Sequence, residues 1–500
     1  MKKHFLLVSM ITALLLSGCQ LGGNSGEQSQ ESSDESQSSL VSSSDNGESS
    51  SQEDSSSGET PIPYDGPKQE GLSNDNFTLT MPTDVSMMSA NCKQYVDDMK
   101  AQQQRLIAQN GADSDYYIND LGGSSGVDIT KGVASGDNGG YRDGKTQNDY
   151  LDAVDAEWEK GEKSDENKGI ELVFAPSDSL KNKEYTVYYS VNSDMSNAKT
   201  IKTSETSICI KNLLVNQKYY VSVSADGKYS NIANFETGDY PRWIDARPMF
   251  NVRDHGGYMT SSGQRIKQGL VYRGGEITPI EGWKSGQQYT GDVGGRYTNS
   301  SGKMQDGHIT TQTEASKKVF RDEMGMVNGL EIDLRSGSER GNPSYQACGF
   351  AENGDIDYAL ISISSYANGL NNNKAQIKQV FEAFAEVDKH PVYYHCYGGA
   401  DRTGTVGFLL GAVLGMSYTD LVIDFELTSY SSNPSRNYRS HLRNGPYNKW
   451  PEMVNTLKSS FGFSSTKTIK QAAEDYLKNQ CNVSQSTIDT IREIMLEPAQ

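Results

Sequence analysis

The chain has 500 residues, a formal net charge of -19 at pH 7, and apolar side chains at 35% of its positions. A chain of this length predicts two or three folded units together with disordered segments. The strongly acidic balance argues against a nucleic-acid partner, because such a partner favours a basic face that displaces counterions. The composition also argues against a protein built from membrane-spanning helices.

Residues 1–18 have the layout of an export signal. Lys2 and Lys3 precede an apolar run from Phe5 to Leu16, which is too short to span a bilayer comfortably. The sequence LSGC that ends at Cys19 resembles the lipobox of bacterial lipoproteins. This resemblance implies cleavage before Cys19, acylation of its sulfur, and anchoring on the extracytoplasmic face of the cell membrane. The alternative is an ordinary secretory signal with an incidental cysteine.

Residues 19–62 consist mainly of Ser, Glu, Asp, Gln and Gly. Such a segment has too few apolar side chains to offset its ordering entropy, so we expect a disordered, acidic tether. Flexible-chain scaling gives about forty residues a reach of roughly 35 Å, which mutual repulsion of like charges extends. A role as an acidic interaction segment is the alternative.

Residues 63–168 give weaker signals. The run from Ala90 to Asn110 predicts a helix that ends at Gly111, and a second helix is expected from Asn148 to Lys160. Clusters of glycine and aspartate such as SGDNGGYRDG predict loops around them. No function follows from this region.

Residues 169–238 have the pattern of a small all-β sandwich. Short alternating runs such as YTVYYSVN and KYYVSVSAD are separated by turn residues at intervals of roughly ten positions. The segment LLVNQKYYVSVSA resembles the tyrosine-corner strand of a fibronectin type III module, with Tyr219 or Tyr220 as the corner residue. Such modules usually act as spacers or docking surfaces, so we expect no chemistry here.

Residues 243–497 form the third predicted unit. The runs GLEIDLR at 329–335 and YALISIS at 358–364 predict short buried strands, and apolar residues at helical spacing precede Pro391. This alternation of strands and helices predicts an α/β domain with a mainly parallel central sheet. Ligands of such sheets gather at the carboxyl ends of the strands, where residues 395–402 would lie.

The turn HCYGGADRTG separates a strand-like run from an apolar, helix-like run. Gly398 and Gly399 let the backbone curl so that successive amides point inward as an anion-binding nest, to which the N-terminal end of the helix adds positive charge. A thiol in such a nest, at Cys396, loses its proton readily. The planar fork of Arg402 can hold two phosphoryl oxygens. Together these groups predict nucleophilic attack on phosphorus.

The pattern of His395, Cys396, five further residues and then Arg402-Thr403-Gly404 resembles the signature of cysteine-dependent protein tyrosine and dual-specificity phosphatases. The resemblance is greatest to the bacterial tyrosine/phosphoinositide phosphatases. Three further segments carry it: NVRDHGGY at 251–258, GLVYRGGEI at 269–277 and EIDLRSGSER at 331–340. Four ordered segments are far more specific than one short motif.

The resemblance implies a role for each residue of the turn. Cys396 would be the nucleophile and form a phosphocysteine intermediate, while Arg402 would bind and stabilise the transferring group. His395 would orient the loop and help keep the thiolate ionised, and the Thr403 hydroxyl would ease breakdown of the intermediate. No metal or other cofactor is required. The remaining phosphoryl oxygens would be bound by the amides of Tyr397, Gly398, Gly399, Ala400 and Asp401.

The leaving alcohol needs a proton, so a carboxylic acid must lie nearby. Two aspartates match positions in this family: Asp401 inside the turn and Asp333 in EIDLR. Its place in the turn favours Asp401, although Asp401 could instead brace the loop, and Asp333 could orient Arg335. The sequence leaves both assignments open.

Three arginines in the other family-like segments, Arg253, Arg273 and Arg335, could add positive potential around the nest and bind substrate. The alternative is that they form salt bridges with acids nearby in the sequence, namely Asp254, Glu276 and Glu339. The remaining histidines show no metal-like spacing. The other cysteines have no framework spacing, and a catalytic thiol must stay reduced, so we assign no disulfide.

Two departures from the family bear on the substrate. Relatives often carry a lysine where this chain has Ala400, and the loss of that cation favours phosphotyrosine over heavily phosphorylated lipid headgroups. A glycine-rich insertion at 279–309 is either a lid over the site or a tolerated surface loop.

We therefore expect a membrane-anchored protein-tyrosine phosphatase that acts on phosphorylated proteins. A phosphoinositide or inositol polyphosphate phosphatase is the alternative within the same class of enzyme. From a different class, the chain could be a binding lipoprotein whose phosphatase fold is only a scaffold. The oligomeric state stays open.

Overall fold

The computed structural model describes residues 62–113, 115, 167–247, 249–277, 288–289, 296–298, 304–306, 314–336, 356–431, 453–454, 456–457 and 467–498. These residues belong to the unit formed by residues 59–500. The predicted export signal, Cys19, the helix expected at 148–160 and most of the 279–309 insertion lie outside the described residues, as does nearly all of the tether.

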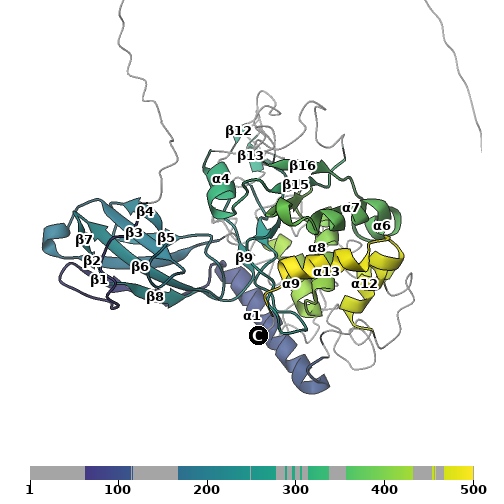
Figure 1. The fold of residues 1–500 in the computed structure, drawn as a ribbon, viewed down its shortest axis with the longest axis horizontal. Coiled ribbons are helices and arrows are strands. Elements are labelled where there is room, and N and C mark those ends of the chain that lie inside the picture. Colours follow the sequence, from purple (N-terminus) through teal and green to yellow (C-terminus); the bar gives the residue numbers. More distant parts are fainter. Residues whose placement is uncertain are drawn as a thin grey trace, which may run out of the picture. The chain divides into compact units, whose positions relative to one another are not determined.

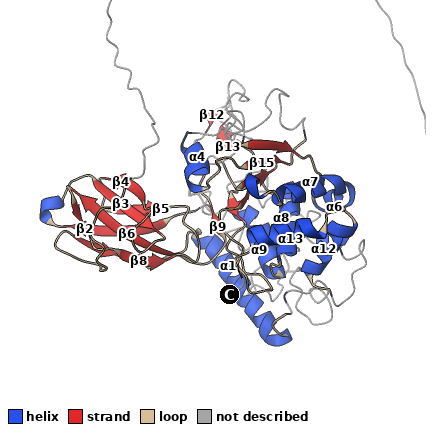
Figure 2. Cartoon of the chain, viewed as in Figure 1, coloured by secondary structure: helices blue, strands red, loops and turns tan. Residues whose placement is uncertain are grey.

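Two antiparallel sheets form the first folded part, where strands dominate (Figure 2). One sheet has the strand order β1-β2-β5, and in the other, β4-β3-β6, both β7 and β8 pair with β6. Buried and exposed residues alternate along β2, as expected where one face of a sheet meets the core. The strands are β1 (Phe77–Thr80), β2 (Ile170–Pro176), β3 (Tyr185–Ser190), β4 (Lys199–Thr203), β5 (Ser207–Ile210), β6 (Lys218–Ala225), β7 (Lys228–Tyr229) and β8 (Ala233–Glu236).

The sandwich begins earlier in the chain than residue 169. Strand β1 comes from the region to which the sequence assigned no role, and it pairs antiparallel with β2. Of the two tyrosine-corner candidates, Tyr219 has the expected geometry: it is 5% exposed, and its hydroxyl accepts a hydrogen bond from the Leu214 amide at 2.9 Å. The resemblance to a fibronectin type III module remains a prediction.

A six-stranded sheet in the order β16-β15-β17-β11-β10-β9 is the centre of the second part. Strands β16, β15, β17 and β11 run parallel to one another, and β10 and β9 add an antiparallel edge. This arrangement fits the expected, mainly parallel sheet. The strands are β9 (Arg242–Trp243), β10 (Arg253–Asp254), β11 (Val271–Gly274), β15 (Leu330–Asp333), β16 (Asp357–Leu360) and β17 (Val392–His395).

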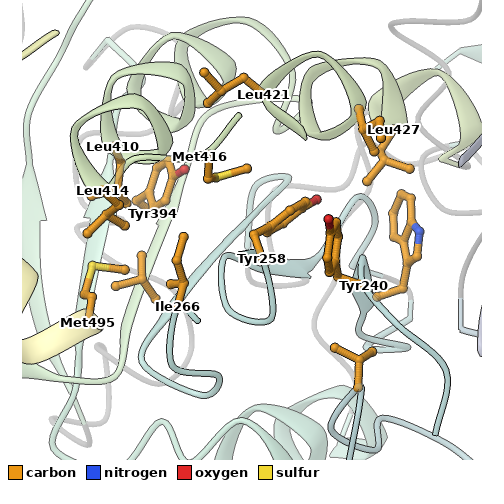
Figure 3. Packing of buried hydrophobic residues seen from close by; sticks show 14 of the residues in the cluster. Tyr240, Tyr258, Ile266, Tyr394, Leu410, Leu414, Met416, Leu421, Leu427 and Met495 are labelled. Atoms are coloured by element: carbon orange, nitrogen blue, oxygen red, sulfur yellow. The ribbon is translucent and has the colours of Figure 1, made fainter. Parts of the chain in front are cut away.

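Helices gather around this sheet (Figure 1). Helix α8 contacts α6, α9 and α12 as well as strands β11 and β17, which explains why its sequence is apolar nearly all round. Figure 3 shows Leu410 and Leu414 of α8 beside Tyr394 of β17. The helices here are α6 (Tyr366–Asn372), α7 (Lys374–Phe384), α8 (Asp401–Leu414), α9 (Tyr418–Glu426), α12 (Ile469–Asn479) and α13 (Gln485–Met495).

Smaller elements complete the described chain. Within the insertion, three short strands form a separate antiparallel sheet, β12-β13-β14. These elements are β12 (Gln288–Tyr289), β13 (Arg296–Thr298), β14 (Met304–Asp306), α4 (Glu314–Lys318) with the π-helical turn η4 (Val319–Glu323), and the short helices η2 (Asp178–Leu180), η5 (Val387–Lys389) and η6 (Leu427–Tyr430). Among the helices of the described ranges, none is long and apolar enough to cross a membrane.

Helix α1 (Ala90–Asn110), which the sequence predicts, lies against α9. Lys100 pairs with Asp420 of α9, and the amide of Gln103 donates to Ser417 Oγ at 2.8 Å. The ring of Tyr95 lies 5.1 Å from that of Tyr430. The region that the sequence left unassigned therefore contributes to both folded parts.

Buried polar contacts join the sandwich to the second part at Arg242. Its guanidinium donates to the carbonyls of Asn212 at 2.8 Å and Leu213 at 3.0 Å, and to Asp254 at 2.6 Å. The side chain of Gln268 adds two bonds to the backbone of Val215, at 2.8 and 2.9 Å. An ion pair that also satisfies backbone carbonyls is costly to break, because its partners would be left buried and unpaired.

Candidate active site

Cys396 directly follows strand β17, and helix α8 begins at Asp401. The loop between them therefore lies at the carboxyl end of a parallel strand, flanked by β11 and β15. The strand is favoured by its sequence, because β-branched and aromatic side chains fit a pleated, buried surface. These side chains are Val392, Tyr393 and Tyr394. The Cys396 side chain is 2% exposed.

Two groups around the loop donate hydrogen bonds to the carbonyls of its first two residues. The ring of His395 donates from Nδ1 to the Cys396 carbonyl at 3.1 Å, and the Glu276 amide donates to the Tyr397 carbonyl at 3.1 Å. A carbonyl oxygen can only accept, so the His395 Nδ1 carries a proton in this arrangement.

Two side chains hold the second half in the same way. Asn251 donates from Nδ2 to the Gly398 carbonyl at 3.0 Å, and Arg273 donates from Nη2 to the Gly399 carbonyl at 3.0 Å. Four consecutive carbonyls of the loop thus accept bonds from groups around it. In a planar trans peptide the N–H points away from the C=O, so the next amides face the opposite side. These amides belong to Tyr397, Gly398, Gly399 and Ala400.

The loop requires glycine at position 399. Gly399 has a φ of +64°, and a Cβ there would lie 2.4 Å from the Gly274 carbonyl carbon. Both the backbone conformation and the close approach to β11 therefore exclude a side chain. The nest expected from the glycines of this turn is thus consistent with the observed backbone geometry.

The first turn of α8 places Arg402 and Thr403 beside the loop. Arg402 is partly exposed, whereas Thr403 is fully buried. The Thr403 hydroxyl has no hydrogen-bond partner among the described residues. A buried hydroxyl of this kind can form a hydrogen bond with a group bound at the loop.

His395 is held in its charged form by two acids. Its Nε2 lies 2.8 Å from Glu331 Oε1. Burial disfavours the charged imidazolium, but the nearby Asp333 and the hydrogen bond to Glu331 outweigh that effect and raise the pKa of His395. The raised pKa favours the charged form of a ring that lies close to the Cys396 backbone.

Asp333 is chelated by Arg335. The guanidinium donates to its carboxylate at 3.0 Å from Nε and 2.8 Å from Nη2, and the hydroxyl of Tyr358 donates to the same carboxylate at 3.1 Å. Burial opposes ionisation, but His395 and Arg335 hold the pKa of Asp333 well below its usual range. The carboxylate orients Arg335, which is one of the two roles weighed for it above.

Arg253 and Arg273, for which the sequence leaves substrate binding and salt bridges both open, are buried in salt bridges. Both side chains are 1% exposed or less and share the carboxylate of Asp424 in α9, at 3.5 Å for Arg253 and 2.5 Å for Arg273. Arg273 also contacts the loop, because it donates a hydrogen bond to the Gly399 carbonyl. The salt bridges weighed as the alternative exist, but their partner is Asp424, not Asp254.

Arg335 is also buried, at 6% exposure, and it pairs with Glu276 at 2.5 Å as well as with Asp333. Glu276 is one of the three acids given as alternative salt-bridge partners of the arginines, and Glu339, another of them, lies outside the described residues. Thus none of the three outer arginines contributes an exposed charge to the mouth of the site. The available signal for Asp424 was an acid within the largely apolar run LVIDFEL, which also contains Glu426.

A further residue not anticipated from the sequence is Tyr366, whose hydroxyl donates to Oδ1 of Asp401. Asp401 is partly buried at the start of α8. The structure thus brings Cys396, Arg402, Asp401 and the loop amides together. In the described ranges, no group of three His, Cys, Asp or Glu side chains is arranged to hold a metal ion.

The structure thus shows a buried thiol, a loop whose carbonyls are bonded to surrounding groups, and an arginine in the first turn of the helix that follows; a loop of this kind can bind an oxyanion. The family model of the tyrosine phosphatase family matches residues 244–497. This match spans more than half of the chain, which therefore belongs to the tyrosine phosphatase family.

A tyrosine-protein phosphatase from Nostoc commune is 26% identical to this chain over 122 residues. The matched region makes up 20% of this chain and 40% of the relative. The similarity thus spans two fifths of the relative's length.

Proposed function

We propose that the protein is a phosphomonoesterase in which the Cys396 thiolate attacks phosphorus. The observation that carries this proposal is the set of four consecutive loop carbonyls that accept bonds from surrounding groups. Because each N–H points away from the preceding C=O, we infer that the following amides face the space beside the thiol. Amides fixed in this way stabilise the negative charge of a transferring phosphoryl group without reorganising during the reaction.

In the first step a bond forms between Cys396 Sγ and phosphorus while the bond from phosphorus to the ester oxygen breaks. The leaving oxygen takes a proton from an acid, and the enzyme becomes a phosphocysteine. In the second step water attacks phosphorus, its proton passes to the same carboxylate, and the thiolate leaves. The products are an alcohol and inorganic phosphate. Arg402 holds two phosphoryl oxygens in both steps.

Asp401 is the proton donor in this proposal, and Asp333 is not. The bidentate pair with Arg335 keeps Asp333 ionised, and an ionised carboxylate has no proton to give. Asp401 lies in the first turn of the helix that follows the thiol loop. Asp401→Asn is expected to slow an ester with a basic leaving group by roughly 10²- to 10⁴-fold, because that group cannot leave unprotonated.

Phosphotyrosine is the substrate class that the site favours. Ala400 supplies no cation within the loop, and Arg253, Arg273 and Arg335 are buried in ion pairs. A headgroup with several phosphates would leave most of its charge without a partner among these groups. A single phosphate on an aromatic ester needs only the loop and Arg402.

The Cys396→Ser variant tests the chemistry. Hydrolysis of p-nitrophenyl phosphate is expected to fall by about 10⁴-fold or more, because serine is a far weaker nucleophile than a thiolate. Vanadate binding, which depends on the amides and Arg402, should persist in this variant. Cys209→Ser is the matched control, since Cys209 is an exposed thiol on the sandwich. Full turnover by Cys396→Ser would refute the proposal.

The substrate class is tested with phosphotyrosine peptides, phosphoserine peptides, phosphoinositides and inositol polyphosphates, each assayed with and without a chelator. Preference for phosphotyrosine peptides is expected. Preference for the lipid or inositol substrates would contradict the substrate assignment while leaving the thiol mechanism in place. Absence of turnover on every ester would instead support a binding lipoprotein with a non-catalytic scaffold.

We also propose that acylation at Cys19 anchors the protein to the extracytoplasmic face of the membrane. This proposal is supported by the LSGC sequence after a short apolar run. Cys19→Ala should move the protein from the membrane fraction to the soluble secreted fraction and leave the specific activity unchanged. Retention of that variant in the membrane fraction would count against lipidation as the anchor.

A further inference from the structure

Tyr366, the first residue of α6, has an unusual backbone conformation. Its φ is +55°, in the left-handed region that an aromatic residue rarely adopts. A conformation of this kind persists only where the surroundings hold it in place, and it is often found where a side chain must be aimed at a functional site. The contacts of Tyr366 show what holds it.

Both ends of Tyr366 are bonded to the first turn of α8. Its amide donates to Thr405 Oγ1 at 2.7 Å, and that hydroxyl donates to the Asp401 carbonyl at 2.9 Å. Its phenol donates to Oδ1 of Asp401. The ring also lies 6.3 Å from that of Phe425 in α9. Backbone and side chain thus fix the phenol against one carboxyl group.

The bond from the phenol determines which carboxyl oxygen can hold the transferable proton. Oδ1 accepts from Tyr366, so a protonated Asp401 that keeps this bond has its proton on Oδ2. The same bond restrains the orientation of the carboxyl group. Proton transfer is faster when the donor group has a fixed orientation, because a small displacement of the donor from the acceptor slows the step considerably.

We propose that Tyr366 is a positioning residue that aims Asp401 Oδ2 at the ester oxygen, an inference that rests on the function proposed above. In the first step the Oδ2–H bond breaks as the leaving oxygen gains the proton. In the second step Oδ2 takes a proton from the attacking water. Tyr366 keeps its own proton and its bond to Oδ1 throughout.

The structure offers a matched control for the test. The other aspartate considered as the acid, Asp333, also accepts from one tyrosine hydroxyl, that of Tyr358. Tyr366→Phe and Tyr358→Phe therefore remove the same group from the two aspartates. Only the first should affect proton donation, because Arg335 keeps Asp333 ionised.

The test measures single-turnover rates for aryl phosphates whose leaving phenols increase in basicity, from p-nitrophenol to phenol. Tyr366→Phe is expected to slow phenyl phosphate by about 10-fold, the kinetic equivalent of one lost hydrogen bond, and to leave p-nitrophenyl phosphate nearly unchanged. Tyr358→Phe should slow neither substrate selectively. Melting temperatures of both variants show whether the fold is intact.

The double variant Tyr366→Phe with Asp401→Asn separates positioning from a general structural effect. If Tyr366 acts through Asp401, the double variant is no slower than Asp401→Asn alone. Additive losses, or an equal slowing of all leaving groups by Tyr366→Phe, would overturn the inference. Neither result would contradict the thiol mechanism, which Cys396→Ser tests separately.

Discussion

Asn251 shows how much a single side chain contributes to the loop. Its amide donates to the Gly398 carbonyl at 3.0 Å and to Thr428 Oγ1 at 3.3 Å, while its own carbonyl accepts from Arg253. Its φ of +59° is one that asparagine tolerates better than most residues. Through these bonds the segment NVRDHGGY contacts the thiol loop although it lies far away in the sequence.

Replacing Asn251 with alanine is expected to weaken vanadate binding by roughly 10-fold, because the Gly398 carbonyl loses a donor and the peptide can rotate. Competitive inhibition of p-nitrophenyl phosphate hydrolysis measures the effect. Asn216→Ala in the sandwich is the control, since Asn216 also has a positive φ but does not bond to the loop. Equal inhibition constants for all three proteins would show that the side chain does not hold the nest.

His255 makes the free energy of unfolding depend on pH. It lies behind the loop against Tyr394 and near Arg253, Arg273 and Asp424, and burial lowers the pKa of its ring to about 3 from 6.5. The unfolded chain binds a proton below pH 6.5 and the folded protein does not. The stability that this residue contributes is therefore complete above pH 6.5 and is lost as the pH falls toward about 3.

His255→Gln should reduce this dependence. Between about pH 7 and about pH 5 the unfolding free energy of the parent protein should fall by about 2 kcal/mol more than that of the variant. Urea denaturation at the two pH values measures the difference. Comparison with the variant is necessary because Asp115, whose pKa burial raises to about 6, titrates in the same range with the opposite sign. Parallel curves would contradict the assignment.

At the scale of elements, the loop between β17 and α8 depends on close approach to β11. Gly399 contacts the carbonyl of Gly274, and Arg273 of the same strand bonds the Gly399 carbonyl. The loop therefore packs directly against β11. Any side chain that separates the two should tilt the amides away from the bound anion.

Gly399→Ala tests this packing. We expect a loss of turnover of about 100-fold or more and a lower melting temperature, because a Cβ cannot fit beside β11. Gly263→Ala is the matched control: Gly263 has a φ of +75°, and a Cβ there would meet nothing within 4 Å. The control should cost only about 1 kcal/mol of stability and no activity. Similar activity of both variants would show that turnover does not depend on close packing of Gly399 against β11.

The sequence was informative where function depends on neighbouring residues. The turn HCYGGADRTG, its strand and its helix are contiguous, so their order already predicted a nest with a thiol and a guanidinium. The residues that hold the loop could not be predicted in the same way. Asn251 and Asp424 reach it from segments far apart in the chain, and their positions follow only from the packing of the sheet and α9.

The outer arginines illustrate the same limit. Their positive charge suggested contact with an anion, but the sequence does not show on which side of a strand a side chain meets a distant acid. In β10 and β11 that acid is Asp424, and both arginines are buried. Similarly, strand β1 joins the sandwich through pairing with β2, which no local pattern indicates.

At the scale of the whole molecule, polar contacts join the sandwich to the second part. Arg242 is bonded both to carbonyls of the sandwich and to Asp254 of the second part, and Gln268 bonds the backbone of Val215. These contacts are buried or partly buried and directional, so separating the two parts would leave polar groups unsatisfied.

Removal of residues 1–241 is therefore expected to lower the melting temperature and solubility of the remaining chain, whereas removal of residues 1–61 should change neither. Differential scanning calorimetry of the three proteins makes the comparison. An undiminished melting temperature for the shorter fragment would mean that the sandwich is a separable module. In that case its role would be docking or spacing alone.

The four carbonyls held outward have a consequence for how the reaction proceeds over time. A receptor site that is already assembled before substrate arrives does not distinguish strongly between the ester and the free inorganic phosphate that is released. The product should therefore compete for the same amides and Arg402. Under the function proposed above, turnover would then slow as released inorganic phosphate accumulates near the site.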